Sequence, residues 1–424
     1  SLSAAWSRLW IISSMWTSSL PKRPGLPSNC SQLFIKPTPK VCIVGGGPAG
    51  FYTAQHLLKA QDDVIVDVYE RLPVPFGLVR FGVAPDHPEV KNVINTFTQT
   101  AQHERCFFHG NVNVGVDVTV KELKKAYHAV VLSYGAEANR CMGVPGEDLA
   151  GVFSARDFVG WYNGLPSNQK LNPDLNCETV VILGQGNVAL DVARILLSPL
   201  DMLKKTDITQ HALEALTASR VRRVLIVGRR GPLQIAGTIK VQHPLFFRHI
   251  VKRQNTLHSM RFFNSSSGIL PLIGSGEDAK AVPTGQMEDL ECGMVISSIG
   301  YKSLPIDPCV PFEHRGAIIP NDMGRVLDTA GLYCSGWVKR GPTGVIATTM
   351  NDSFDTARVL LKDMKEGTLD LSVNKPGAQE ITALLQERGN THRNTQKKKN
   401  EGVPGGAEQS LLQLIPSHPI THLS

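Results

Sequence analysis

Short apolar runs alternate with longer amphipathic stretches along much of the chain. Residues 40–44 and 64–69 are apolar runs, and residues 51–59 between them carry a helical pattern. Apolar runs of roughly four to eight residues beside glycine are typical of strands buried in a parallel sheet. The pattern therefore predicts a strand–helix–strand unit.

The same order of elements recurs in the middle of the chain. Residues 179–183 form another apolar run, and residues 190–194 belong to the helix predicted after it. A mostly helical stretch follows over residues 198–219, and residues 221–227 predict a further strand. Two such units in one chain predict an α/β protein with two Rossmann-like domains.

A glycine-rich turn joins the first predicted strand to its helix. Gly45, Gly47 and Gly50 fit G-x-G-x-x-G, which lets the backbone approach a pyrophosphate that the helix N-terminus then stabilises. The next strand ends on Glu70, twenty residues after Gly50, where a carboxylate can accept hydrogen bonds from ribose hydroxyls. These features predict a dinucleotide site. The alternative is a plain glycine turn with a coincidental acidic residue.

The second unit carries a related turn with a different strand end. The variant G-x-G-x-x-A is formed by Gly184, Gln185, Gly186, Asn187, Val188 and Ala189. The strand that follows ends beside Arg229 and Arg230. Guanidinium groups bind phosphate in a bidentate manner, whereas a carboxylate would repel a 2′-phosphate. This contrast predicts NADP rather than NAD at the second turn. The alternative is that Arg229 and Arg230 are only solvent-exposed residues at the end of a strand and bind no phosphate.

Charge is concentrated at the N-terminal end. The net charge is +7, and five basic residues precede the first acidic residue, Asp62; without those five the net charge is +2. They are Arg8, Lys22, Arg23, Lys36 and Lys40. An arginine-containing, serine-rich and acid-free leader is typical of a mitochondrial transit peptide. The alternatives are a disordered N-terminus without function, or translated upstream sequence. The charge distribution gives no support for a nucleic-acid partner.

The eight cysteines form neither a C-x-x-C pair nor a zinc-ligand spacing. Several lie in apolar runs, so we expect buried, reduced thiols, which suits a matrix protein. No run approaches the roughly 20 apolar residues that a membrane-spanning helix needs.

Two segments are too particular for composition to explain. One is PFGLVRFGVAPDHP at residues 75–88, with KNVINTF at 91–97, and the other is CSGWVKRGPTGVIATTM at residues 334–350. By these motifs the chain closely resembles the adrenodoxin reductases, a family of mitochondrial ferredoxin–NADP reductases. The resemblance runs, with gaps, from about Val41 to Gly389.

This resemblance implies a glutathione-reductase-like fold in which the NADP domain is inserted in the FAD domain. It divides the chain into a leader (1–39), a first FAD-domain part (40–138), an NADP domain (139–297), a second FAD-domain part (298–389) and a disordered tail (390–424). By motif match, the implied flavin contacts are Ala49, Glu70, Leu78, Val114, Trp337, Gly344, Val345 and Ile346. The implied NADP contacts are Gly184, Gln185, Gly186, Asn187, Arg229 and Arg230.

The chemistry that the resemblance implies belongs to the cofactors FAD and NADP, which pass electrons from NADPH to an iron–sulfur partner. We therefore name no catalytic acid or base. His56 and Asp191 are the nearest candidates, and packing or hydrogen bonding is the favoured role for each. The implied setting is the matrix side of the inner mitochondrial membrane, with a monomeric protein at most peripherally associated with it.

The chain departs from the family pattern in three respects. Val241 stands where the family has a cofactor-contacting Glu, and residues 242–259 are shortened and dissimilar. From Asn390 onwards the chain shows no resemblance. Three interpretations remain: an active ferredoxin reductase, a splice-altered isoform that binds FAD but is impaired in NADPH use or ferredoxin docking, and the NADPH-oxidising subunit of another flavoprotein. The lack of cysteine clusters argues against the third.

Overall fold

The computed structural model describes residues 37–228 and 289–390, together with the backbone of five two-residue strands. These strands are β9 (Phe262–Phe263), β10 (Leu272–Ile273), β11 (Lys280–Ala281), β12 (Met287–Glu288) and β18 (Arg393–Asn394). β9 pairs with β12 and β10 with β11, each antiparallel. Several sequence predictions fall outside the described residues: the leader before residue 37, Arg229 and Arg230, segment 241–259, and the tail beyond Asn390 apart from β18.

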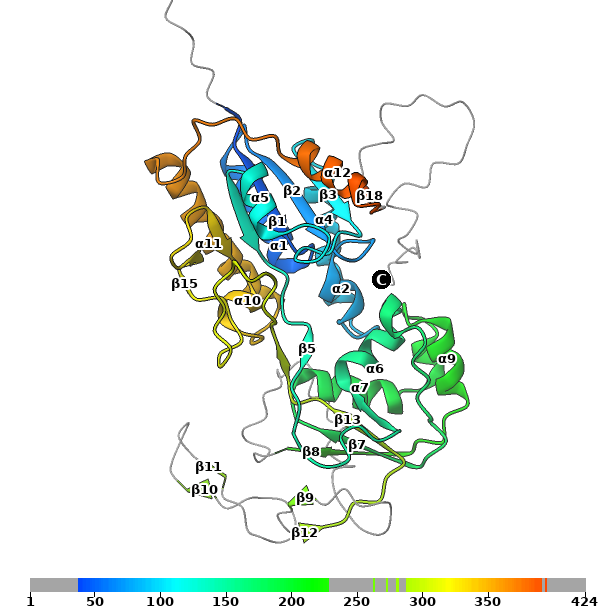
Figure 1. Ribbon diagram of the computed structural model, residues 1–424. Helices are drawn as coiled ribbons and strands as arrows, with labels where there is room; N and C mark the ends of the chain where they lie inside the picture. The colour runs from blue at the N-terminus through cyan, green and yellow to red at the C-terminus, as the bar shows by residue number, and fades with distance from the viewer. Residues whose placement is uncertain are drawn as a thin grey trace, which may run out of the picture. The chain divides into compact units, whose positions relative to one another are not determined.

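The first sheet has eight strands in the order β15-β16-β17-β4-β1-β2-β3-β18. Strands β1, β2 and β3 of this sheet are labelled in Figure 1. Its strands before β18 are β1 (Lys40–Val44), β2 (Ile65–Glu70), β3 (Cys106–Gly110), β4 (Ala129–Leu132), β15 (Asn321–Asp322), β16 (Arg325–Val326) and β17 (Leu332–Cys334). The strands from β17 to β3 are parallel, and Val44 pairs with both Tyr69 and Leu132. The carboxyl ends of β1, β2 and β4 therefore meet at one edge.

The alternating side chains of β1 face two separate cores. Val41 and Ile43 belong to a cluster with α1 (Pro48–Ala60), α4 (Val93–Ala101) and α11 (Ile346–Glu366). Cys42 and Val44 belong to a second cluster with α5 (Val120–Ala126) and α12 (Ala378–Glu387). Because both faces are covered, the strand is apolar and buried from Val41 to Val44, as parallel strands between two helical layers are.

The second sheet is fully parallel, with the order β6-β13-β7-β8. Its strands are β6 (Val152–Ser154), β7 (Thr179–Leu183), β8 (Arg223–Val227) and β13 (Met294–Ser297). Helices α6 (Ala155–Tyr162), α7 (Asn187–Leu197) and α9 (Gln210–Thr217) cover one face through a shared apolar cluster. The short helices elsewhere are α2 (Gly77–Phe81), α3 (Pro88–Lys91), η1 (Pro166–Asn168), α8 (Leu200–Leu203) and α10 (Trp337–Arg340).

Two short strands connect the sheets. The chain leaves β4 through β5 (Ala138–Asn139) and returns towards β15 through β14 (Tyr301–Lys302), and β5 and β14 pair antiparallel. All four strands of the second sheet lie between β4 and β15 in the sequence. The predicted fold class is confirmed: two Rossmann-like units, the second inserted in the first.

Candidate functional site

The first nucleotide turn is held by the ends of three neighbouring strands. Gly45 follows β1 with φ of +110°, and its N–H donates to the Tyr69 carbonyl at 2.8 Å. A Cβ on Gly45 would lie 2.5 Å from the Ser133 carbonyl oxygen. Only glycine fits this position, because both the backbone conformation and the close approach exclude a side chain.

The second turn repeats this geometry. Gly184 follows β7 with φ of +118°, its N–H donates to the Val227 carbonyl at 2.7 Å, and a Cβ would lie 2.1 Å from the Ser298 carbonyl oxygen. Ser298 N–H donates to the Leu183 carbonyl at 2.7 Å, as Ser133 N–H does to the Val44 carbonyl at 2.8 Å. The same turn is therefore built twice, once in each sheet, from a glycine after the first strand and a serine after a neighbouring one.

The middle glycines of the two turns begin helices and face open space. Gly47 is the N-cap of α1 and Gly186 that of α7, and a Cβ on either would meet no atom within 4 Å. Neither glycine has a side chain that could accept hydrogen bonds from the N–H groups of the first helical turn. An uncapped helix N-terminus beside open space suits a phosphate. The two turns thus fit the pyrophosphates of two dinucleotides.

Glu70 ends β2 beside the first turn and is buried. Its Oε2 accepts from Gly46 N–H at 2.8 Å and its Oε1 from Leu72 N–H at 3.0 Å. Burial raises the pKa of Glu70, and the hydrogen bonds from Leu72 and Gly46 oppose that rise. Each carboxylate oxygen has a second lone pair, so the fixed carboxylate retains capacity to accept from a ribose hydroxyl.

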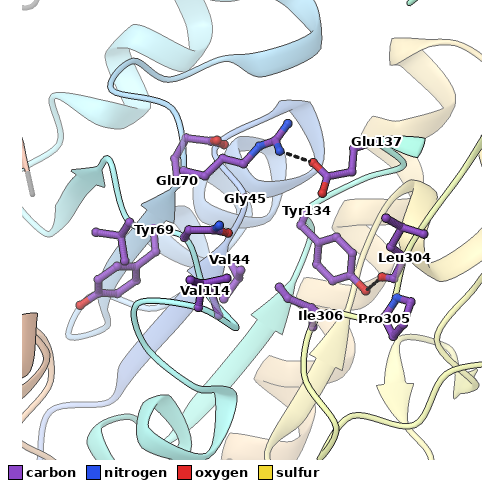
Figure 2. A pocket seen from close by; sticks show the side chains of 14 residues that line it. Val44, Gly45, Tyr69, Glu70, Val114, Tyr134, Glu137, Leu304, Pro305 and Ile306 are labelled. Carbon is purple, nitrogen blue, oxygen red and sulfur yellow. Dashed lines mark hydrogen bonds and ion pairs between the residues drawn. The ribbon is translucent and has the colours of Figure 1, made fainter. Parts of the chain in front are cut away.

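A cavity of about 240 Å³ opens beside Glu70 (Figure 2). Gly45, Val114 and Tyr134 line it together with the segment 304–306 that follows β14. The Tyr134 hydroxyl donates to the Leu304 carbonyl at 2.9 Å, which joins the two connecting segments at the cavity wall. The apolar side chains of Val44, Val112, Val114 and Ile306 beside the Glu70 carboxylate suit an adenosine group.

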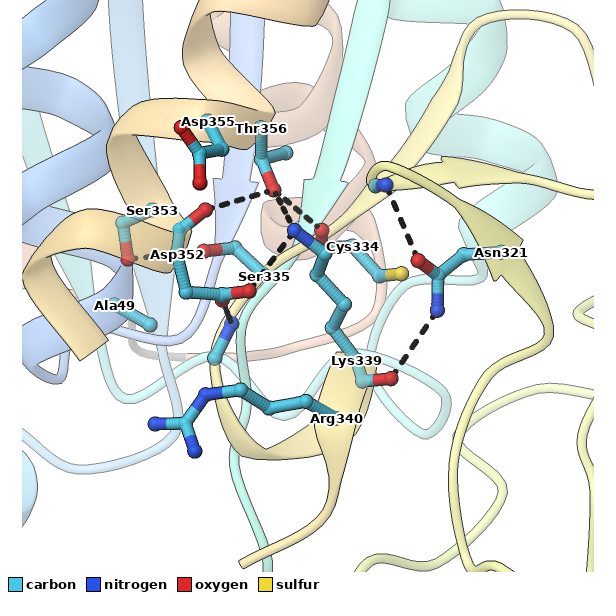
Figure 3. A network of polar contacts seen from close by, with 12 residues as sticks. Ala49, Asn321, Cys334, Ser335, Lys339, Arg340, Asp352, Ser353, Asp355 and Thr356 are labelled. Atoms are coloured by element: carbon cyan, nitrogen blue, oxygen red, sulfur yellow. Dashed lines mark hydrogen bonds and ion pairs between the residues drawn. The ribbon is translucent and has the colours of Figure 1, made fainter. Parts of the chain in front are cut away.

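A polar network fixes the turn that precedes α10 (Figure 3). Gly336 N–H donates to Asp352 Oδ2 at 2.6 Å, and Lys339 Nζ lies 2.9 Å from Asp352 Oδ1. Gly336 has φ of +74°, and a Cβ on it would lie 2.6 Å from the Cβ of Ala49. The structure therefore brings Ala49 against the turn that carries Trp337.

The loop between α10 and α11 and the first residue of α11 carry three of the implied flavin contacts, Gly344, Val345 and Ile346. Arg340 donates to the Thr343 carbonyl and, at 2.9 Å, to Thr349 Oγ1. Gly344 has φ of +80° and is exposed, as is Val345, while Ile346 is half-buried and begins α11. Arg340 thus ties the loop to the first turn of α11.

The other implied contacts occupy several environments. Val114 is buried in the cavity wall, whereas Leu78 on α2 is 38% exposed. The Trp337 ring stacks on Tyr301, with the ring centroids 6.0 Å apart. Gln185 lies against Gly228, which follows β8. A Cβ placed on Gly228 would lie 2.3 Å from the Gln185 Oε1.

His56 and Asp191 do not meet. His56 packs on Phe354 with ring centroids 5.0 Å apart, and burial lowers its pKa. Asp191 accepts from Arg194 at 2.8 Å and lies 3.8 Å from His87 Nε2. The packing and hydrogen-bonding roles favoured for both residues agree with these contacts. His87 was not among the candidates from sequence, although it lies within the family motif at residues 75–88.

The cysteine prediction is only partly right. The seven described cysteines are all free, and Cys42, Cys106 and Cys334 are buried. However, Cys141 and Cys309 are exposed because they lie in connecting segments rather than in strands. Within the described ranges, no group of three or more His, Cys, Asp or Glu side chains is placed to hold a metal. No helix in the described part of the chain is long and apolar enough to cross a membrane.

Comparisons with known proteins agree with this geometry. A family model described as pyridine nucleotide-disulphide oxidoreductase matches residues 39–230. The mitochondrial NADPH:adrenodoxin oxidoreductase of Salvelinus fontinalis is 64% identical over 414 residues, which cover 83% of the chain and 83% of the relative. That of Bos taurus is 54% identical over 446 residues, with 90% of each covered. The solved structure of Mycobacterium tuberculosis FprA in complex with NADPH matches with a TM-score of 0.74 at 36% identity, covering 84% of this chain and 91% of that one.

Proposed function

The chain belongs to the family of mitochondrial NADPH:adrenodoxin oxidoreductases, and from that premise we propose that it transfers electrons from NADPH through FAD to a [2Fe–2S] ferredoxin of the adrenodoxin type. The observation that carries the proposal is the nucleotide turn built twice, around Gly45 and around Gly184, each at the end of a strand with parallel neighbours on both sides. One chain thereby offers separate sites for FAD and NADP.

The residues of the chain bind and orient, while FAD supplies the conversion of a two-electron donor to single-electron transfer. The N-terminus of α1 and Glu70 hold the pyrophosphate and ribose at the first turn, and the N-terminus of α7 holds the pyrophosphate at the second. The Asp352–Lys339 network fixes the Gly336 turn, and with it the backbone position of Trp337. No acid or base is assigned.

The cofactor contacts remain those that the motif match implies. At the flavin site they are Ala49, Glu70, Leu78, Val114, Trp337, Gly344, Val345 and Ile346. For NADP we propose Gly184, Gln185, Gly186, Asn187, Arg229 and Arg230. The domain limits are likewise a proposal: 40–138 and 298–389 for the FAD domain, and 139–297 for the NADP domain.

The relatives are named as mitochondrial proteins, and we extend this to the matrix side of the inner membrane. The basic, acid-free leader supports import. A monomer with at most peripheral membrane contact is part of the same proposal. Neither the fold nor the comparisons favour the splice-altered alternative.

Stopped-flow spectroscopy tests the proposal. The purified protein is expected to contain FAD, to lose its flavin absorbance on mixing with NADPH, and to reduce an added [2Fe–2S] ferredoxin afterwards. Glu70→Ala should weaken FAD binding by about 1.5–3 kcal/mol, because hydrogen bonds to an ionised acceptor contribute that much. A flavin-containing protein that NADPH fails to bleach would contradict the proposed activity.

A further inference from the structure

Two oppositely charged side chains meet at the edge of the cavity beside the first nucleotide turn. Arg71 follows Glu70 at the end of β2, and Glu137 directly precedes β5. An Arg71 guanidinium nitrogen (Nη1) lies 2.6 Å from Glu137 Oε2, and both residues line the cavity (Figure 2). The side chains are 45% and 37% exposed, so the pair lies at the mouth rather than in the core.

The two residues come from different segments of the chain. Arg71 belongs to the sheet edge that carries Glu70, and Glu137 belongs to the connecting segment that continues into β5. The other connecting segment, 304–306, forms part of the same wall and is joined to Tyr134 by the hydrogen bond to the Leu304 carbonyl. The ion pair therefore bridges an opening between a fixed strand end and the strands that lead to the second sheet.

We propose that Arg71 and Glu137 form an ionic clasp that closes the cavity over the adenosine end of bound FAD and slows its release. The inference rests on the proposed function, because it requires FAD at the first turn. Glu70, the acceptor proposed for the ribose, lines the same cavity, and Arg71 is the next residue along the chain. An adenosine group that fills the cavity displaces water beneath the pair, which strengthens the attraction between the charges.

The size of the effect follows from the exposure of the pair. Exposed ion pairs contribute little, and salt screens them. We expect Arg71→Gln and Glu137→Gln each to accelerate FAD release roughly twofold to fivefold at low ionic strength. The double variant should be no faster than the faster single variant, since either change alone opens the clasp. The acceleration should shrink at an ionic strength of about 1 M, where the screening length is about 3 Å.

The experiment measures FAD release from the holoprotein by the rise in flavin fluorescence after dilution. The charge-reversed variant, Arg71→Glu with Glu137→Arg, should restore the parental rate to within about twofold. If the two side chains acted only through their packing, exchanging the charges would not restore the rate. Arg358→Gln with Asp355→Asn is the matched control, because that exposed pair on α11 has a similar N–O distance of 2.7 Å and does not line the cavity.

Each outcome decides the proposal. Release at the parental rate in both single variants, additive effects in the double variant, or no recovery on charge reversal would each overturn the clasp.

Arg156 lies near Glu137 and Arg71, and burial lowers its pKa although the charge of Glu137 opposes that fall. If Glu137→Gln slows release instead, the attraction of the uncompensated arginines for the negatively charged FAD diphosphate governs release, and the clasp is wrong. A parent protein without flavin overturns the proposed function as well, whereas equal rates in a flavin-containing series overturn only the clasp.

Discussion

Each nucleotide turn contains two glycines that are required for different reasons. At Gly45 and Gly184 the backbone has positive φ and a Cβ would collide with a carbonyl oxygen of the neighbouring strand end. At Gly47 and Gly186 φ is ordinary and the space is open. The first kind is needed by the fold, and the second kind leaves room for a ligand. The sequence motif alone does not distinguish them.

Alanine substitutions should separate the two kinds. Gly45→Ala and Gly184→Ala should reduce the free energy of unfolding by about 1–3 kcal/mol or more, because strain and collision add. Gly47→Ala should change it by less than about 1 kcal/mol while weakening FAD binding on the order of tenfold or more. Urea unfolding of the apoprotein and FAD titration provide the two measurements. An apoprotein destabilised equally by Gly45→Ala and Gly47→Ala would refute the distinction.

At the scale of elements, the strands that the hydrophobic pattern marks strongly are predictable from sequence. The predicted bounds of β1 and β7 agree with the structure, since both strands are buried along nearly their whole length. Helix α1 begins at Pro48, three residues before the predicted start, because its first turn consists of small residues that carry no apolar period. The predicted helical stretch 198–219 divides into α8 and α9.

The cavity could not be predicted in the same way. Its walls combine the end of β2 with residues around positions 114, 134 and 305, which are brought together only by strand order. Glu70 is predictable because its distance from the glycine turn is set by one strand–helix–strand unit. Glu137 has no such fixed spacing, and no local motif marks it. Contacts made within one unit are predictable from sequence, whereas contacts made between units depend on the sheet order.

Asp363 shows how one side chain joins three elements. Located on α11 and buried, it accepts from Arg325 of β16 at 2.8 and 2.7 Å and from the Tyr333 hydroxyl of β17 at 2.8 Å. Burial alone would raise the pKa of Asp363, but the hydrogen bonds from Arg325 and Tyr333 outweigh it and lower the pKa. The ionised form therefore stabilises the attachment of α11 to the sheet.

Asp363→Asn should lower the free energy of unfolding at pH 7 by about 1–3 kcal/mol, since it leaves Arg325 and Tyr333 without their charged acceptor. The folded-state pKa lies below the unfolded value of about 3.9, so this stability is present above that pH and is lost as pH falls below it. Urea unfolding of parent and variant from pH 7 to pH 3 should show the gap narrowing. Asp355→Asn on the same helix is the exposed control and should cost little.

At the scale of the whole molecule, the two nucleotide-binding units differ mainly at the carboxyl end of their second strand. Both units build the same turn, with the same hydrogen bond from the first glycine and the same open N-cap. The first unit ends β2 with a buried carboxylate, and the second ends β8 before two arginines. We propose that this difference sets the nucleotide at each turn, because a carboxylate repels a 2′-phosphate and guanidinium groups attract it.

Replacing Arg229 and Arg230 by glutamine should therefore reduce kcat/KM for NADPH far more than for NADH, while the FAD content stays at the parental level. Only NADPH carries the 2′-phosphate, and each charge-assisted hydrogen bond from an arginine to that phosphate contributes roughly 1.5–3 kcal/mol to binding. For the two contacts together, the NADPH preference should accordingly fall by about a hundredfold to ten-thousandfold. Both nucleotides are measured with an artificial electron acceptor, so that ferredoxin docking does not affect the rates.

Arg222→Gln is the matched control, because this exposed arginine precedes β8 at its opposite end. Val241 stands where the family has a glutamate, and weaker NADPH binding in the parent would reduce the difference between parent and double variant. The parental ratio of kcat/KM for NADPH to kcat/KM for NADH is therefore the reference. If the double variant keeps that ratio, the arginines are a solvated strand end, and nucleotide choice resides elsewhere in the second unit.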